Sequence, residues 1–372
     1  MTKSGSFKRA VRKHARATGL RYTEALAAMT RGQAAEPVSR PFEHAALKSH
    51  LEERYGIRIA ALAPVDDHPE SAPSDSWPGH YPSTVYVKRD GGAPWIARIF
   101  SSPTDTLSRV EGDAEILRFL ASNDFPAERL AHDEPVSVLD GSGVIVTKFI
   151  EGGRPASSPV VQRELGNLLG RLHSLPPGGG AVARDGGSEE TLGDIYVGRP
   201  KQDLAAAMSF LASVEDAVAP EGREKFEWLR DQVENADDAE GLPEAFTHGN
   251  YHLWAAVGKP GNLHIVGWAG SGRGPRLPAL AWLLRTAAES GKIAEVEAVV
   301  RGYREHVKLT DEELDRLPGV LNMKPIWLAC LEYRMCVRGG TTPTFDNEPG
   351  WVGWRPEHGE QIAGHVIPMF RS

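Results

Sequence analysis

The sequence predicts an α+β fold of two lobes, in which an antiparallel sheet with a helix precedes a mainly helical half. Two observations support this prediction. Apolar residues alternate in strand-length runs between residues 83 and 148, and one pair of runs is joined by Asp90-Gly91-Gly92, which is typical of a hairpin turn. Beyond residue 152, apolar residues recur instead at the spacing of amphipathic helices. At 372 residues the chain is long enough for two such lobes.

Residues 40–151 are predicted to form the first lobe. Within it, residues 62–83 are so rich in Pro, Ser and Asp that we expect an irregular loop there. The other predicted elements are, in chain order, a helix over 44–56, the hairpin over 83–100, a helix over 107–122, and two strands between 133 and 155 that end in a hinge.

Residues 152–340 are predicted to form the second lobe. In its first helix the leucines between positions 165 and 172 share one face, as expected for a helix that packs on a core. Residues 341–372 are rich in Gly, Pro, Trp and His, and we expect them to lie across the body as an extended tail. The predicted helices run over 160–175, 202–218, 223–237, 292–307 and 311–338.

The stretch from Thr247 to Leu284 organises the chain. It predicts a loop, a short hairpin, a turn and a helix, which is the order found in kinase-like phosphotransferases. Phosphoryl transfer requires a carboxylate that orients or deprotonates the acceptor hydroxyl, and oxygen ligands that hold Mg²⁺ against the nucleotide. At the corresponding positions this stretch has Asn250, Ala255 and Gly267.

The same stretch resembles the motif of the aminoglycoside phosphotransferase family, which is roughly His-Gly-Asp, Asn five residues later, and then Ile-Asp-Trp. His248, Gly249 and Trp268 match that motif, and residues 270–284 resemble the stretch that follows it in a bacterial branch of the family. The resemblance covers about residues 40–340 and implies a protein-kinase-like fold of two lobes.

Three residues depart from the family motif. Asn250 stands at the position of the catalytic base, and an amide does not accept a proton at neutral pH. Ala255 and Gly267 stand at the metal-ligand positions and have no side-chain oxygen. We therefore expect a degenerate member of the family that has no metal site and no cofactor, unless ATP still binds.

The resemblance also places a nucleotide site in the first lobe. Arg98 matches the phosphate-contacting lysine of the family, and its predicted ion-pair partner is Asp113, with Glu115 and then Glu111 as alternatives. A surface salt bridge is the other interpretation of each pair.

Residues 146–150 correspond to the hinge segment whose backbone meets an adenine ring in the family. Thr147 and Phe149 in this segment are therefore predicted cofactor contacts. Residues 77–84 hold one glycine where the family has a glycine-rich turn, so we expect them to wrap phosphates poorly.

Other groups near the altered motif are candidates for binding or chemistry. His252 is a candidate general acid or base, since imidazole titrates near neutral pH, and a loop histidine that faces solvent is the alternative. Trp254 and His248 are candidate substrate contacts, although the family gives His248 a structural role. Arg273 and Arg276 are candidate ligands for a phosphate or carboxylate, or else pack at the start of a helix.

Charge is unevenly distributed along the chain. In residues 1–33 eight Lys and Arg stand against Glu24, a net charge of +7, and because the whole chain carries −8 the remainder carries −15. Residues 1–33 are predicted to form a basic helical extension, which either binds a partner protein or is a solvated appendage. The acidic remainder argues against nucleic acid as a partner.

The apolar runs and the cysteines indicate the compartment. The sequence has no apolar run long enough for a membrane span and no secretory leader, so we expect a cytoplasmic protein. Cys330 and Cys336 lie six apart in an apolar helix, a spacing that suits neither a zinc site nor a disulfide framework.

Three functions follow from this sequence. The first is a pseudokinase that binds a small molecule or peptide, and a partner protein, in a bacterial natural-product or modified-peptide pathway. The second is an enzyme that uses the same cleft for metal-free acid and base chemistry, such as cyclisation or elimination, on a peptide or antibiotic intermediate. The third is an active ATP-dependent small-molecule phosphotransferase, which would need other carboxylates as metal ligands.

Overall fold

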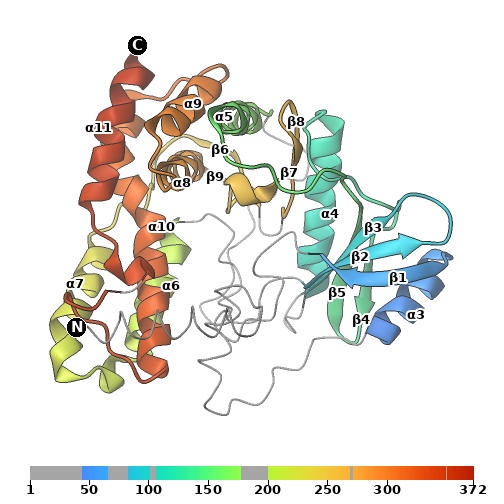
Figure 1. Cartoon of the computed structure of the whole chain (residues 1–372), viewed down its shortest axis with the longest axis horizontal. Coiled ribbons are helices and arrows are strands. Elements are labelled where there is room, and N and C mark those ends of the chain that lie inside the picture. The colour runs from blue at the N-terminus through green and yellow to red at the C-terminus, as the bar shows by residue number, and fades with distance from the viewer. Residues whose placement is uncertain (1–43, 66–82, 101–105, 177–199, 269–270, 349) are drawn as a thin grey trace, which may run out of the picture.

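The computed structural model describes residues 44–65, 83–100, 106–176, 200–268, 271–348 and 350–372. It confirms the predicted fold: an antiparallel sheet with its helices forms one lobe, and a mainly helical lobe lies beside it (Figure 1). The predicted basic extension over 1–33 and residues 66–82 of the predicted loop lie outside the described residues.

The first lobe is a five-stranded antiparallel sheet in the order β1-β2-β3-β5-β4. Helix α3 (His44–Tyr55) and the alternate residues Val144 and Val146 share one core cluster, whereas Ile145 belongs to the cluster that contains α4 (Thr106–Ser122). The two helices therefore cover opposite faces of the sheet (Figure 1). The strands are β1 (Ile59–Pro64), β2 (Ser83–Arg89), β3 (Trp95–Phe100), β4 (Val136–Leu139) and β5 (Ser142–Lys148).

The predicted hairpin is confirmed and one strand was missed. Gly91 and Gly92 have φ of +88° and +87° at the turn between β2 and β3, a backbone conformation that glycine adopts without strain. Residues 62–64 were assigned to an irregular loop, and this prediction is wrong because they end β1 and pair with β2. The proline at position 64 concealed the strand, since proline is tolerated at the end of an edge strand.

The second lobe contains the predicted helices and three elements that the sequence analysis did not separate. Helix α10 begins with a capping box, in which Thr310 and Glu313 bind each other's backbone N–H. The missed elements are the paired strands β6 (Glu244–Thr247) and β9 (Gly272–Pro275), and the C-terminal helix α11 (Glu357–Arg371). The others are α5 (Pro159–His173), α6 (Pro200–Ala212), α7 (Arg223–Glu234), α8 (Leu277–Ala288), α9 (Ile293–Tyr303) and α10 (Asp311–Arg338), with the hairpin of β7 (Ala256–Lys259) and β8 (Asn262–Ile265).

Helices α5 and α9 approach each other closely at two glycines. A Cβ atom on Gly166 would lie 2.2 Å from the carbonyl oxygen of Val299, and one on Gly302 would lie 2.0 Å from that of Arg163. Glycine is therefore needed at both points of contact, which explains why two helices of ordinary composition pack backbone against backbone.

The expected extended tail is wrong for residues 357–371. These residues form α11, which packs on α8, α9 and α10 with Ala363, Val366 and Phe370 buried (Figure 1). Glycine and proline hid the helix in the sequence, but Gly359 is there for contact: a Cβ at this position would lie 2.6 Å from the side-chain amide of Asn322.

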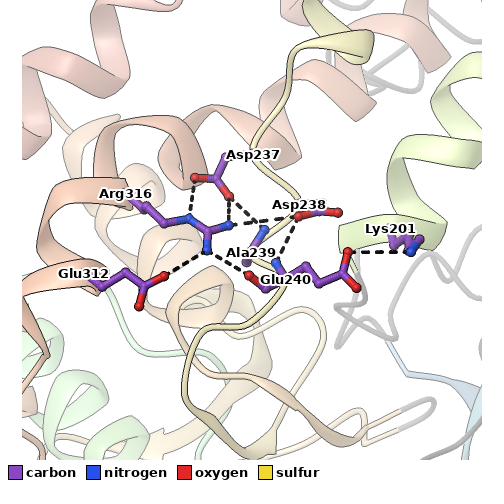
Figure 2. A network of polar contacts seen from close by, with 7 residues as sticks. All are labelled: Lys201, Asp237, Asp238, Ala239, Glu240, Glu312 and Arg316. Carbon is purple, nitrogen blue, oxygen red and sulfur yellow. Dashed lines mark hydrogen bonds and ion pairs between the residues drawn. The ribbon is translucent and has the colours of Figure 1, made fainter.

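A polar network fixes the segment that leads into β6 (Figure 2). The guanidinium of Arg316 on α10 donates to both carboxylate oxygens of Asp237 and to the carbonyl of Glu240. Asp237 in turn accepts the backbone N–H of Ala239, which has φ of +56°. Residues 237–240 are thus tied to α10 just before the chain enters the strand that carries the motif loop.

Within the described part of the chain, none of the helices is both long and apolar enough to cross a membrane.

Cys330 is buried and Cys336 partly buried, and both thiols are free. Burial raises the pKa of Cys330, and burial together with Glu332 raises that of Cys336 to about 11, so neither is a reactive thiolate near neutral pH.

Candidate functional site

His248 fixes the loop that follows β6. Its side chain is 2% exposed, and its Nε2–H donates to the carbonyl of Val266 at 3.1 Å. Its Nδ1 accepts the backbone N–H of Asn250 at 3.2 Å, and its ring contacts Trp268 with centroids 4.8 Å apart. This geometry favours a structural role for His248 over a substrate contact.

Asn250 faces the second lobe from that loop. Its Oδ1 accepts the indole N–H of Trp282, a residue of α8, at 3.2 Å. A side-chain amide that receives a hydrogen bond on its only oxygen offers no basic atom to an acceptor hydroxyl. Asn250 therefore positions Trp282 and does not abstract a proton.

The other two altered positions supply no metal ligand. Ala255 ends the short 3₁₀ helix Leu253–Ala255 and is 3% exposed. Gly267 has φ of +79°, and a Cβ atom there would have no neighbour within 4 Å. Within the described ranges there is also no group of three or more His, Cys, Asp or Glu arranged to hold a metal ion. Positions 255 and 267 thus offer no side-chain oxygen to the ligand set that Mg²⁺ prefers.

A carboxylate that the sequence analysis did not single out lies in the cleft. Glu128 is 3% exposed, and its Oε1 accepts the backbone N–H of Gly267 at 3.0 Å. Its Oε2 accepts both the guanidinium of Arg98 and the hydroxyl of Thr147. One carboxylate therefore connects β3 and β5 of the first lobe to the turn at Gly267 in the second lobe, which stands at a metal-ligand position of the motif.

The short segment between α4 and β4 brings Glu128 to this place. The backbone N–H of Glu128 donates to the carbonyl of Ile265, and the N–H of Ile265 donates to that of Pro126. This pairing ties the segment to β8. Glu128 belongs to no motif and follows no period, so its role could not be predicted from the sequence.

The predicted partners of Arg98 on α4 differ in exposure. Asp113 is 5% exposed, whereas Glu111 and Glu115 lie on the exposed face of the helix. Of the three, Asp113 has the burial that a partner of Arg98 needs, and the pairing itself stays a prediction. The described contact of Arg98 is with Glu128.

A cavity of about 200 Å³ lies between the lobes. Its charged lining consists of Arg98, Glu128, Lys148 and Arg154, and the predicted hinge contributes Phe149. Thr147, the other predicted cofactor contact, is fully buried with its hydroxyl on Glu128. The apolar part of the lining consists of Val65, Ile96, Phe149, Ile150, Val257 and Val266.

Two glycines hold the hinge against the β7–β8 hairpin beside this cavity. Gly152 and Gly258 have φ of +124° and +123°, and a Cβ on Gly152 would lie 2.9 Å from the Cα of Gly258. The N–H of Gly258 also donates to the carbonyl of Gly153 at 2.9 Å. The two lobes therefore meet here without any side chain between them.

Comparison with known proteins identifies the family. The sequence model of the APH phosphotransferase enzyme family matches residues 74–317. The chain belongs to this family. No curated protein sequence matches it.

Solved structures of several kinases and phosphotransferases share the fold over most of their length. An amicoumacin kinase crystallised with AMP-PNP, Ca²⁺ and its ligand is 11% identical, with a TM-score of 0.56 over 90% of this chain and 97% of that one. A microcompartment-associated aminopropanol kinase is 16% identical, with a TM-score of 0.53 over 88% and 98%. The macrolide 2'-phosphotransferase MphH of Brachybacterium faecium is 18% identical, with a TM-score of 0.50 over 87% and 98%. At these identities the likeness shows the fold.

Both candidate anion-binding arginines of this APH-family protein are engaged in ion pairs. Arg273 on β9 contacts Glu244 on β6 at 3.3 Å. Arg276 donates two hydrogen bonds of 2.7 Å to the carboxylate of Glu313 and one to the carbonyl of Lys308. This geometry corresponds to the alternative that Arg276 packs at the start of α8, since it joins that helix to the start of α10.

Aromatic side chains gather beside Asn250. Trp254 stacks on His252 with ring centroids 6.3 Å apart, His252 contacts Trp282 at 6.1 Å, and Trp282 contacts Trp351 at 5.9 Å. We call these four residues the aromatic row. Trp254 is 42% exposed. His252, the candidate general acid or base, is thus a member of the row.

An arginine stacks on each end of the aromatic row. The guanidinium of Arg154, which also lines the interlobe cavity, lies 5.1 Å from the ring centroid of Trp254. That of Arg285, one turn beyond Trp282 on α8, lies 5.9 Å from the centroid of Trp351. The cavity and the row therefore adjoin each other at Arg154.

Sequence reasoning missed the distant members of this site. Trp282 and Arg285 lie three apart on one helix, which indicates a shared face but gives no partner. Trp351 comes from the 3₁₀ helix Gly350–Gly353, far along the chain, and only the folded path of the C-terminal segment brings it to the row.

Proposed function

We propose that this APH-family protein is a pseudokinase, which binds a ligand between its lobes and does not carry out ordinary Mg²⁺ and ATP-dependent phosphoryl transfer. The observation that carries the proposal is the position of the Glu128 carboxylate. This carboxylate accepts hydrogen bonds from the guanidinium of Arg98 and from the backbone N–H of Gly267. These two groups stand at the positions that bind phosphates and metal in the family.

The charge of that site supports the proposal. In an active site of this kind, cationic and metal groups neutralise the developing charge on the phosphates. Here the cation at position 98 is already neutralised by a buried carboxylate, and positions 250, 255 and 267 bring no ligand for a metal that would restore the balance. A nucleoside triphosphate would therefore meet a neutral ion pair at Arg98 in place of a net positive charge.

Isothermal titration calorimetry of the purified protein with ATP, with and without Mg²⁺, tests the proposal. We expect no Mg²⁺-dependent binding in the micromolar range and no ADP release in a coupled assay. Glu128→Gln supplies a matched comparison, because it keeps the shape of the side chain and removes its charge. Micromolar binding that requires Mg²⁺, together with ADP release by the unaltered protein, would instead establish an active phosphotransferase.

A natural-product or modified-peptide pathway and a bacterial cytoplasmic setting are part of the same proposal. They are supported by the antibiotic-modifying activities named for the structural neighbours, an amicoumacin kinase and a macrolide phosphotransferase among them. The alternative enzyme, with His252 as a metal-free acid or base, predicts a specific loss. His252→Phe, which keeps the aromatic contact, would abolish turnover of a pathway intermediate only if the imidazole acts chemically.

A further inference from the structure

Three donors from different parts of the chain converge on the Glu128 carboxylate. The guanidinium of Arg98 on β3 and the hydroxyl of Thr147 on β5 both donate to Oε2, the hydroxyl at 3.0 Å. The backbone N–H of Gly267 donates to Oε1, also at 3.0 Å. We call these three donor groups the cradle. Because each carboxylate oxygen has its own donor and one donor carries a positive charge, the cradle has the charge and the geometry of a carboxylate-binding site.

The cradle borders the interlobe cavity. Arg98 and Glu128 both line that cavity, and Val266, which precedes the glycine of the cradle, lines it as well. Glu128 is only 3% exposed, so its carboxylate shields the donors from water while it is in place. A ligand in the cavity therefore meets a cradle that is already occupied.

The backbone on both sides of Glu128 is fixed by hydrogen bonds. The N–H of Glu128 donates to the carbonyl of Ile265, and the N–H of Ile265 donates to the carbonyl of Pro126. One residue further on, the carbonyl of Arg129 accepts the N–H of Lys148 at 2.7 Å. The carboxylate can therefore leave the cradle by rotation about its side-chain bonds, without a movement of the segment that carries it.

The size and lining of the cavity indicate the class of molecule that could replace Glu128. Its apolar side chains come from both lobes, Ile96 and Val257 among them. Its volume of about 200 Å³ compares with about 150 Å³ for an apolar cavity that holds one benzene ring. A compound with one aromatic ring and a short chain therefore fits the cavity, and the cradle at its border selects a carboxylate on that chain.

We propose that Glu128 is an autoinhibitory contact: its carboxylate occupies a binding site for small apolar carboxylates, and such a ligand binds by displacing it. This inference rests on the proposed function in placing a ligand between the lobes, and it adds the class of that ligand and the group that regulates its entry. A tethered group competes at an effective concentration on the order of millimolar or above, so the contact keeps weakly binding carboxylates out.

Isothermal titration calorimetry with 3-phenylpropanoate tests the proposal. Glu128→Ala removes the internal carboxylate and retains the three donors. We expect this variant to bind the compound with a Kd on the order of 0.1–1 mM, and the unaltered protein to bind it at least about tenfold more weakly. The matched ligand control is the neutral 3-phenylpropanamide. It should bind Glu128→Ala about tenfold more weakly than the acid, because it lacks the charge that pairs with Arg98.

Two further variants separate binding at the cradle from a general loosening of the structure. Adding Thr147→Val to Glu128→Ala removes one donor at nearly constant volume and should weaken the binding of 3-phenylpropanoate about tenfold. Glu134→Ala removes an exposed carboxylate that pairs with Arg54, and it should bind the compound no better than the unaltered protein does. If Glu128→Ala is unfolded in buffer, circular dichroism replaces calorimetry: 3-phenylpropanoate should restore the native signal and the amide should not.

Several results would overturn the inference. They are equal affinity of Glu128→Ala and the unaltered protein for 3-phenylpropanoate, equal affinity for the acid and its amide, unchanged affinity after Thr147→Val is added, or a gain in Glu134→Ala. Failure of the compound to restore an unfolded Glu128→Ala would do the same.

The ATP titration of the unaltered protein judges the proposed function separately. Equal affinity of Glu128→Ala and the unaltered protein for 3-phenylpropanoate, with ATP unbound, would remove this inference alone. Mg²⁺-dependent ATP binding with ADP release would remove the proposed function and leave the comparison between the two proteins standing.

Discussion

The backbone N–H of Gly267 donates to Glu128 across 3.0 Å, and this hydrogen bond crosses from one lobe to the other. Because the same carboxylate also holds Arg98, a single side chain connects the sheet to the altered metal turn. The contact between the lobes at this point therefore depends on one buried charge.

Glu128→Gln should lower the free energy of unfolding by about 3–5 kcal/mol, because it leaves the buried guanidinium of Arg98 without its counter-charge. Urea unfolding followed by circular dichroism measures the change. The control is Glu134→Gln, which removes the partner of Arg54 in an exposed pair and should cost less than about 1 kcal/mol. If both changes lowered the free energy of unfolding equally, the buried Arg98–Glu128 pair would contribute no more to stability than the exposed pair.

Gly258→Ala should destabilise the protein much more than Gly261→Ala. Both glycines have positive φ, but a Cβ at 258 would lie 2.5 Å from the carbonyl oxygen of Asn262, while one at 261 has no neighbour within 4 Å. We expect a loss of about 1 kcal/mol at position 261 from backbone strain alone, and about 3 kcal/mol or more at 258. Thermal unfolding of the two variants makes the comparison, and similar melting temperatures would contradict it.

Asn250→Asp alone should not produce ATP turnover. The change supplies the carboxylate of the base, but Ala255 and Gly267 still provide no oxygen ligand for the metal. Adding Gly267→Asp introduces a side chain into free space at a φ of +79°, which costs about 1–3 kcal/mol of strain. ADP release by Asn250→Asp in the presence of Mg²⁺ would show that other groups already bind the metal.

His173 should make the protein less stable as the pH falls below neutrality. Burial, with a smaller contribution from Arg276, lowers the pKa of His173 from 6.5 to about 3. Between these values the unfolded chain binds a proton that the folded protein does not, so the free energy of unfolding decreases by about 1.4 kcal/mol per pH unit.

Replacement by Gln isolates this effect. Between pH 7.5 and pH 5, wild type should lose about 2 kcal/mol relative to His173→Gln, as measured by urea unfolding at each pH. The exposed His358→Gln serves as the control and should follow wild type. Parallel curves for wild type and His173→Gln would mean that His173 binds its proton equally in the folded and unfolded states.

The fold was predictable because its signals are local. Alternation over 83–148 and the glycine turn at 91–92 predicted the hairpin, and periodic leucines predicted α5. Helix α11 was missed for a physical reason: Gly359 weakens helix propensity in the sequence, yet it is required for contact with Asn322, and only the packed structure reveals that benefit.

The site was predictable only in part. The motif predicted the order of loop, hairpin and turn that carries Asn250, Ala255 and Gly267, because these residues lie within one short stretch. Glu128 and Trp351 reach the same region through tertiary contacts, which leave no period or spacing in the sequence. Charge pairs and aromatic contacts between distant segments are therefore the part that required a structure.

Trp351 lies beyond residue 317, where the match to the family model ends, yet its ring completes the aromatic row. One member of the aromatic row is thus encoded outside the region that the family model matches. A chain cut at residue 317 would leave Trp282 without the ring of Trp351 and helices α8 and α9 without the cover of α11, so the folded unit is longer than the region matched by the family model.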